Sequence, residues 1–136
     1  MKIAICRSMT FSKEMVNTKK QLEKLHHEGI ISDLIDVYLL DDKKEIEKVT
    51  LKYKNEKDAM MEYWDLIQDS DAILVLNYDR KSIKNYIGGN SFLEMGFAYG
   101  FGKKIYLLNP IPEMVYSDEI VAMKPIVLDG DLNKIT

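Results

Sequence analysis

Three short runs of apolar residues constrain the fold of this chain of 136 residues more than any other feature. They span residues 2–6, 71–76 and 105–108, and almost every side chain in them is apolar. A strand that is apolar on both faces belongs in the interior of a sheet with helices packed on either side. We therefore expect these runs to be the central strands of a parallel sheet.

Segments with helical periodicity separate the apolar runs. Helices are predicted over residues 12–27, 56–68, 92–101 and 116–123, and two further strands over residues 30–37 and 126–128. Strands that alternate with helices indicate an α/β sandwich of three layers with a parallel sheet in the middle. With five strands and right-handed crossovers, the expected strand order is 2-1-3-4-5. The last residues, 129–136, are predicted to form a tail.

The overall composition fits a single globular domain and excludes several functions. The formal net charge is −3 and the basic residues form no stripe, so duplex nucleic acid is not an expected partner. No apolar segment is long enough to span a membrane and no signal peptide is apparent, which predicts a cytoplasmic protein. Cys6 is the only cysteine. It excludes an internal disulfide, and we interpret it as a small buried side chain.

A charge-dense segment covers residues 41–57, where acidic and basic side chains occur without a clear apolar face. Mixed charge of this kind is typical of a solvated segment. We expect the segment to be mobile and to be the best candidate for a lid over a binding site.

Glu94 is the only carboxylate in the apolar helix predicted over residues 92–101. Burying a carboxylate is costly unless another group pairs with it, so its position needs an explanation. In one interpretation Glu94 closes a capping box with Ser91, three residues earlier. In the other it faces a cleft as a catalytic nucleophile and is kept ionised by the helix dipole.

The expected topology favours the second interpretation. In sheets of this order, ligands bind at the carboxyl ends of the strands, where the winding direction reverses between the first and third strands. The loops at that point span residues 7–12 and 77–91, and Glu94 follows the second loop within one helical turn. Glu94 is therefore expected to face the ligand crevice.

The loop after the first strand carries groups that suit a phosphate. Arg7, Ser8, Thr10 and Ser12 lie ahead of a predicted helix, whose free amides would add to the hydroxyls and the guanidinium. Serine and threonine favour any helix start, so this signal is weak. Neither a glycine-rich dinucleotide motif nor a P-loop occurs, and the two histidines are adjacent. We predict no cofactor and no metal site.

Asp79 is the best candidate for a proton donor in the crevice. Beside an ionised Glu94 its pKa would rise, and it could then protonate a leaving group. A simpler interpretation is that Asp79 pairs with the neighbouring Arg80. Glu62 and Asp65, on the preceding helix, are alternative acids.

The sequence resembles the nucleoside 2-deoxyribosyltransferase superfamily in three places. These are residues 1–11, residues 70–77 and, most specifically, residues 89–104, which are similar to the family's glutamate–x–glycine–x–alanine helix and the glycine–lysine strand start after it. The resemblance implies a flavodoxin-like fold and cleavage of the N-glycosidic bond of a 2′-deoxynucleoside or its 5′-monophosphate. It also implies a covalent deoxyribosyl-enzyme, whose sugar passes to another base or to water, and a homo-oligomer.

Carried onto this chain, the resemblance implies that Glu94 is the nucleophile and that a small nucleoside or nucleotide is the ligand. Substrate contacts are expected from both crevice loops, through Arg7, Ser8, Met9, Thr10, Phe11, Asn77, Tyr78, Gly88, Gly89, Asn90 and Ser91. Residues 86–90 contain no acid, although family members commonly have an aspartate there. The alternative is a catalytically inactive nucleotide-binding or sensing module of the same fold.

Overall fold

The computed structural model describes residues 1–6, 12–32, 43–45, 47–48, 51 and 59–136. Within these residues, a five-stranded sheet has the order β2-β1-β3-β4-β5, and every pair of neighbouring strands is parallel, as predicted. The strands are β1 (Lys2–Cys6), β2 (Glu28–Ile30), β3 (Ala72–Val75), β4 (Lys104–Leu107) and β5 (Ile126–Val127). At the end of β1, Cys6 lies beside Val75 of β3.

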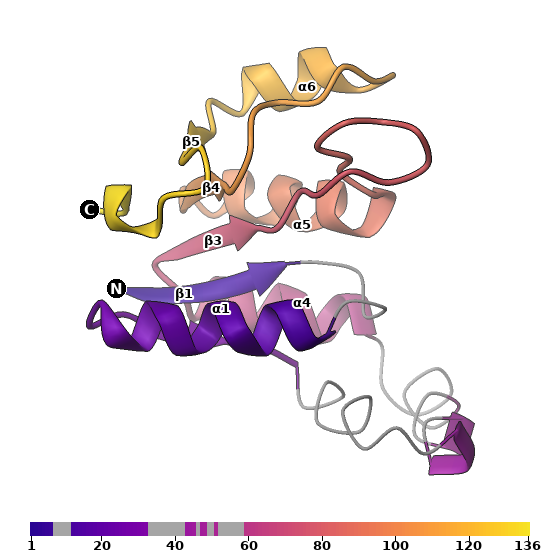
Figure 1. The fold of residues 1–136 in the computed structure, drawn as a ribbon, viewed down its shortest axis with the longest axis vertical. Helices are drawn as coiled ribbons and strands as arrows, with labels where there is room; N and C mark the ends of the chain where they lie inside the picture. The colour runs from indigo at the N-terminus through magenta and orange to yellow at the C-terminus, as the bar shows by residue number, and fades with distance from the viewer. Residues whose placement is uncertain (7–11, 33–42, 46, 49–50, 52–58) are drawn as a thin grey trace.

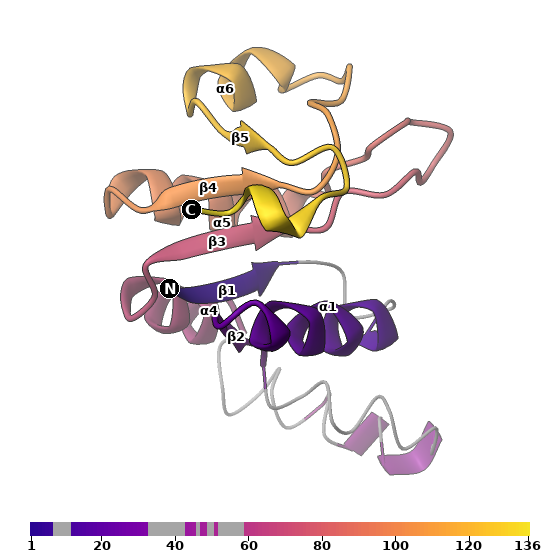
Figure 2. The same ribbon diagram turned by 60° about the vertical axis from the view of Figure 1, so that its left-hand side comes forward.

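Helices cover both faces of the sheet (Figures 1 and 2). They are α1 (Ser12–Lys24), α4 (Ala59–Gln68), α5 (Gly89–Gly100), α6 (Ser117–Ala122) and the 3-10 helix η2 (Leu132–Lys134). One core cluster joins α1 and η2 to one face, and a second joins α4, α5 and α6 to the other. Because successive strand residues point to opposite faces, Ile5 belongs to the first cluster and Cys6 to the second.

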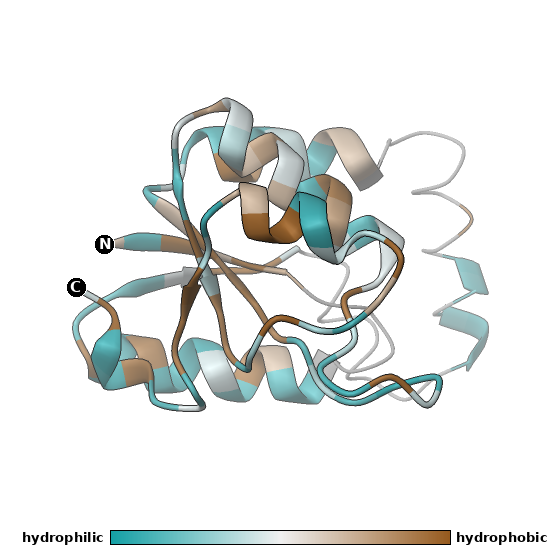
Figure 3. Cartoon of the chain, turned by 90° about the horizontal axis from the view of Figure 1, so that it is seen from above, coloured by the Kyte–Doolittle hydropathy of each residue, from teal (hydrophilic) through white to brown (hydrophobic). Residues whose placement is uncertain are grey.

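The distribution of hydropathy follows these layers. Figure 3 shows hydrophobic strands in the interior, with hydrophilic residues gathered on the surrounding helices and loops. The side chains of β3 are buried along its whole length. The continuous apolar run therefore reflects a strand covered on both faces, as the sequence predicted.

The second strand differs from its prediction. The helix predicted to reach residue 27 ends at Lys24, His26 takes a positive φ of 67°, and Gly29, just before the predicted strand, lies inside β2. A Cβ atom on Gly29 would lie 3.0 Å from the Cγ of Lys19, so a larger residue here would force α1 to shift slightly away from this strand. Residues 33–37 of the predicted strand lie outside the described residues.

The predicted tail is also a folded element. Leu132 and Ile135 are buried in the core cluster on the α1 side of the sheet. Asp131 caps η2 by accepting a hydrogen bond from the backbone amide of Asn133 at 3.0 Å. The prediction of a tail was wrong because two apolar side chains, spaced three residues apart, are enough to anchor so short a helix.

Most of the charged segment over residues 41–57 lies outside the described residues, so the lid stays a prediction. Residues 43–45, 47–48 and 51 are helical, and their side chains are exposed. No helix among the described residues combines the length and the apolar character that crossing a membrane requires.

Candidate active site

The local structure around Glu94 excludes the capping box. Helix α5 begins three residues earlier than predicted, with Gly88 as its N-cap and no side-chain hydrogen bond at the cap. Ser91 is therefore a buried residue within the first turn, and Glu94 lies in the second turn. The carboxylate is not folded back onto the start of its helix.

Glu94 lies near titratable side chains from two other elements, β1 and α4. Cys6, at the end of β1, is fully buried and is close enough to Glu94 for each group to shift the pKa of the other. Tyr63, on α4, donates a hydrogen bond at 3.0 Å to the carbonyl oxygen of Ile5. The same phenol is bonded to the backbone of Ser32. Together Cys6, Tyr63 and Glu94 form what we call the glutamate cluster.

Burial dominates the electrostatics of the glutamate cluster. It raises the pKa of Glu94 from 4.5 to about 7, and the nearby Cys6 thiol, as a hydrogen-bond donor, opposes this rise. The Oε2 atom of Glu94 is buried and has no hydrogen-bond partner among the described residues. We expected the helix dipole to keep this carboxylate fully ionised. Because the dipole acts mainly within the first turn and Glu94 lies in the second, desolvation outweighs it.

The other two members of the cluster stay neutral near pH 7. Burial, followed by the charge and the acceptor oxygens of the nearby Glu94 carboxylate, raises the pKa of Cys6 well above its usual value. Burial, then the charges of Cys6 and Glu94, likewise raise the pKa of Tyr63. Glu94 is therefore the member of the cluster that changes its charge near neutral pH.

Sequence reasoning missed Tyr63 as a neighbour of Glu94. The candidate acids on the same helix were Glu62 and Asp65, but Asp65 is exposed and Glu62 is only partly buried. Tyr63 lies in the core, on the side of α4 that faces the sheet. The missed signal is its hydroxyl group, since a buried tyrosine hydroxyl requires a hydrogen-bond partner.

Asp79 and Asn77 have structural contacts of their own. Asp79 is exposed and accepts a hydrogen bond at 2.9 Å from the backbone amide of Asn85. Asn77 is buried, and its side chain bonds to the backbone amide and carbonyl of Asn109, each at 2.9 Å. Asn77 thus ties the end of β3 to the end of β4. The catalytic role of Asp79 and the substrate contact of Asn77 stay predictions.

The remaining predicted contacts lie at the start of α5 or outside the described residues. Gly88 caps α5, and the next two residues, Gly89 and Asn90, are exposed. The amides that open a helix are free to bind a ligand. Arg7, Ser8, Met9, Thr10 and Phe11 fall outside the described residues.

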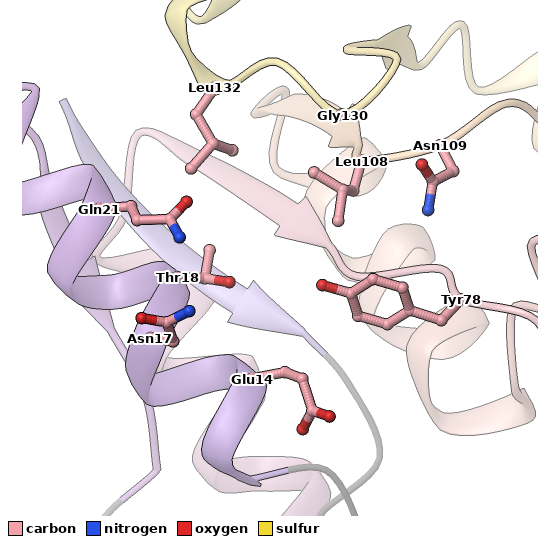
Figure 4. A pocket seen from close by; sticks show the side chains of 9 residues that line it. All are labelled: Glu14, Asn17, Thr18, Gln21, Tyr78, Leu108, Asn109, Gly130 and Leu132. Carbon is pink, nitrogen blue, oxygen red and sulfur yellow. The ribbon is translucent and has the colours of Figure 1, made fainter.

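A separate cavity of about 270 Å³ lies on the α1 side of the sheet, beyond the ends of β3 and β4 (Figure 4). It is lined by Glu14, Asn17, Thr18, Gln21, Tyr78, Leu108, Asn109, Gly130 and Leu132. The lining contains an acid and no lysine or arginine, so the cavity is poorly suited to a phosphate. Tyr78 points into it, but no residue of the glutamate cluster lines it.

Comparison with known proteins identifies the fold. No protein-family model matches the sequence, and no curated protein matches it. Among solved structures, the chain is similar to the CMP N-glycosidase BcmB of Clostridium botulinum, with a TM-score of 0.51 and 17% identity. The match covers 93% of this chain and 85% of BcmB. The chain therefore has the flavodoxin-like α/β fold of this N-glycosidase, as its resemblance to the deoxyribosyltransferase superfamily predicted.

Proposed function

We propose that this protein cleaves the N-glycosidic bond of a 2′-deoxynucleoside or its 5′-monophosphate. The observation that carries the proposal is the carboxyl group of Glu94, whose Oε2 atom is buried without a partner among the described residues, in a fold shared with a nucleotide N-glycosidase. A buried carboxyl group with a raised pKa is a common feature of catalytic sites. Core packing alone gives no reason to retain such a costly group.

In the proposed reaction, the ionised carboxylate of Glu94 attacks the anomeric carbon of the sugar. The bond from that carbon to the base nitrogen breaks, and its electron pair leaves with the base, which takes a proton from an acid. Asp79 is our proposed acid. The resulting glycosyl ester is then opened by water or by a second base, which restores the Glu94 carboxylate. This is the two-step course of retaining glycosidases.

The surroundings of Glu94 fit a nucleophile that acts on a developing cation. In the free protein the ionised carboxylate is poorly solvated, which raises its pKa to about 7. In the transition state the anomeric carbon gains positive charge, and a desolvated carboxylate next to it is strongly stabilised. Most of the attraction between the Glu94 carboxylate and the anomeric carbon thus arises in the transition state, and it therefore accelerates the reaction.

The pH dependence of kcat/KM distinguishes a nucleophile from an acid at position 94. Burial raises the pKa of Glu94 to about 7, and only the ionised form can attack. The ionisation of Glu94 should give kcat/KM an ascending limb of about tenfold per pH unit below pH 7, and loss of the proton from the acid should give a descending limb. The assay should use a nucleoside without a phosphate group. The second pKa of a phosphate is about 6, so its titration would overlap that of Glu94. A profile without the ascending limb would contradict the nucleophilic role.

Arg7 is our proposed ligand for a 5′-phosphate. It follows β1 directly and precedes α1, so it belongs to the crevice loop of this fold. A phosphate would gain charge-assisted hydrogen bonds from the guanidinium, whereas a neutral nucleoside would gain little. If Arg7 has this role, monophosphates should be better substrates than the corresponding nucleosides.

We further propose that the protein is a homo-oligomer. Several large apolar side chains on α4 and α5 are exposed, including Met60 at 51%, Leu93 at 46% and Trp64 at 36%. Clustered exposed apolar groups are typical of interaction surfaces. Light scattering on the purified protein should give at least twice the chain mass of 15.8 kDa. A monomer at micromolar concentration would contradict this proposal.

A further inference from the structure

The cavity on the α1 side of the sheet, here called the α1 cavity, has one polar wall and one apolar wall. The polar wall is a single face of α1, because its residues recur at the helical spacing i, i+3, i+4 and i+7. They are Glu14, Asn17, Thr18 and Gln21. Tyr78, Leu108 and Leu132 form the apolar wall. Figure 4 shows Gln21 and Thr18 extending from α1 toward Tyr78.

Hydrogen bonds hold the wall opposite α1 in place. The side chain of Asn77, which precedes Tyr78, bonds to the backbone amide and carbonyl of Asn109, each at 2.9 Å. The side chain of Asn109 donates a bond of the same length to the carbonyl oxygen of Asn77. The amide of Gly130 donates to the carbonyl oxygen of Leu108 at 2.7 Å. A cavity whose walls are fixed in advance loses little conformational entropy when a ligand binds.

The charge and the size of the α1 cavity restrict its ligand. Among the described residues that line it, Glu14 is acidic and none is basic. A carboxylate accepts hydrogen bonds and repels anions, so a neutral ligand with N–H donors fits best. The volume of about 270 Å³ lies just below the range of about 300–1,000 Å³ for pockets that hold drug-sized molecules. One ring system therefore suits the cavity better than a whole nucleotide.

We propose that the α1 cavity is a second ligand site, which binds a free nucleobase with an exocyclic amino group apart from Glu94. The amino group donates to the carboxylate of Glu14, and the face of the ring lies against Tyr78. Asn17 and Gln21 can each donate to or accept from the remaining polar atoms of the base. The choice of a nucleobase among planar heterocycles rests on the proposed function, because a base is the leaving group of that reaction.

Cytosine and uracil are a matched pair of ligands for this site. They have similar shape, but uracil has a carbonyl group where cytosine has its amino group, and a carboxylate can bond only to the latter. Calorimetric titration of the wild type should show cytosine binding at least about tenfold more tightly than uracil. Glu14→Gln should largely remove this difference, because an amide can also donate to a carbonyl group. Glu23→Gln removes an exposed acid from the same helix, outside the cavity, and should bind as the wild type does.

A second pair of variants tests the place of binding. Asn17 and Lys20 are both exposed on α1, but only Asn17 lines the α1 cavity. Asn17→Phe should fill the cavity and abolish the binding of cytosine, whereas Lys20→Phe should leave it unchanged. Glu94→Gln should also bind cytosine normally, because no residue of the glutamate cluster lines the cavity.

These titrations need no turnover, so they can fail independently of the proposed function. Equal affinity for cytosine and uracil, or no binding of either base, would overturn the second site. Loss of cytosine binding in Glu94→Gln, with binding kept in Asn17→Phe, would place the base at Glu94 and would also overturn it. Binding that Asn17→Phe abolishes, in a protein that releases no base from any substrate, would support the second site and overturn the proposed function.

Discussion

Glu94→Gln is expected to lose at least about 1,000-fold in kcat/KM for base release, which corresponds to about 4 kcal/mol of transition-state stabilisation. Glutamine has nearly the same shape as glutamic acid, so the packing of α5 should be preserved. Its amide cannot form the glycosyl ester, and it carries no negative charge to stabilise the developing cation. Chromatographic assay of the released base gives the rate, and circular dichroism checks the fold.

Asp65→Asn is a matched control for this variant. Asp65 lies on the neighbouring helix α4 and is exposed, so the substitution removes one carboxylate without touching the glutamate cluster. Its activity should stay close to that of the wild type. Substantial turnover by Glu94→Gln would contradict the mechanism, whereas equal losses in both variants would indicate a general effect of charge.

Glu94→Gln is also expected to gain stability relative to the wild type as the pH rises. The pKa of Glu94 is raised from 4.5 to about 7 in the folded protein. Below pH 4.5 Glu94 is protonated in both the folded and the unfolded wild type, so its ionisation costs no unfolding free energy. Between pH 4.5 and about 7 Glu94 ionises only in the unfolded chain, and the unfolding free energy of the wild type falls until the pH exceeds the pKa of the folded protein. A shift of this size amounts to about 3 kcal/mol.

Urea unfolding of both proteins at pH 4 and pH 9 measures this difference. The unfolding free energy of the wild type, relative to that of Glu94→Gln, should be lower at pH 9 by about 3 kcal/mol. Asp65→Asn should show no comparable change, because its carboxylate is exposed. The difference in unfolding free energy between wild type and Glu94→Gln could instead be the same at pH 4 and pH 9. This result would show that Glu94 ionises in the folded protein as easily as in water. The catalytic carboxylate would in that case carry no cost in stability.

The sheet could be predicted because its central strands are apolar on both faces. That pattern excludes an edge position, and right-handed connections leave few alternatives for the order of the strands. The errors arose at short elements. Gly29 is a helix-stop signal in isolation, but here its missing Cβ allows Lys19 to lie against β2. The burial of Leu132 depends on packing against residues from four other elements, which no local pattern records.

The site could be predicted only in part. Glu94 stood out because it is a lone carboxylate among apolar residues. Cys6 was predicted to be a buried side chain, and it lies in the core together with Tyr63. Their proximity to Glu94 arises because the fold brings β1, α4 and α5 together. Residues so far apart in the sequence share no periodic pattern that would reveal it. The pKa of Glu94 was misjudged because a helix start displaced by three residues moves it from the first turn to the second.

The most direct test is an assay for free base with a panel of nucleosides and their 5′-monophosphates, each in ribose and 2′-deoxyribose form. The wild-type protein is predicted to release base from at least one 2′-deoxy substrate, with faster release from its monophosphate if Arg7 binds the phosphate. Calorimetric titration of the same panel measures binding independently of turnover. Binding of a nucleotide without release of base from any member would contradict the account and would identify a nucleotide-binding module that has kept the fold without the chemistry.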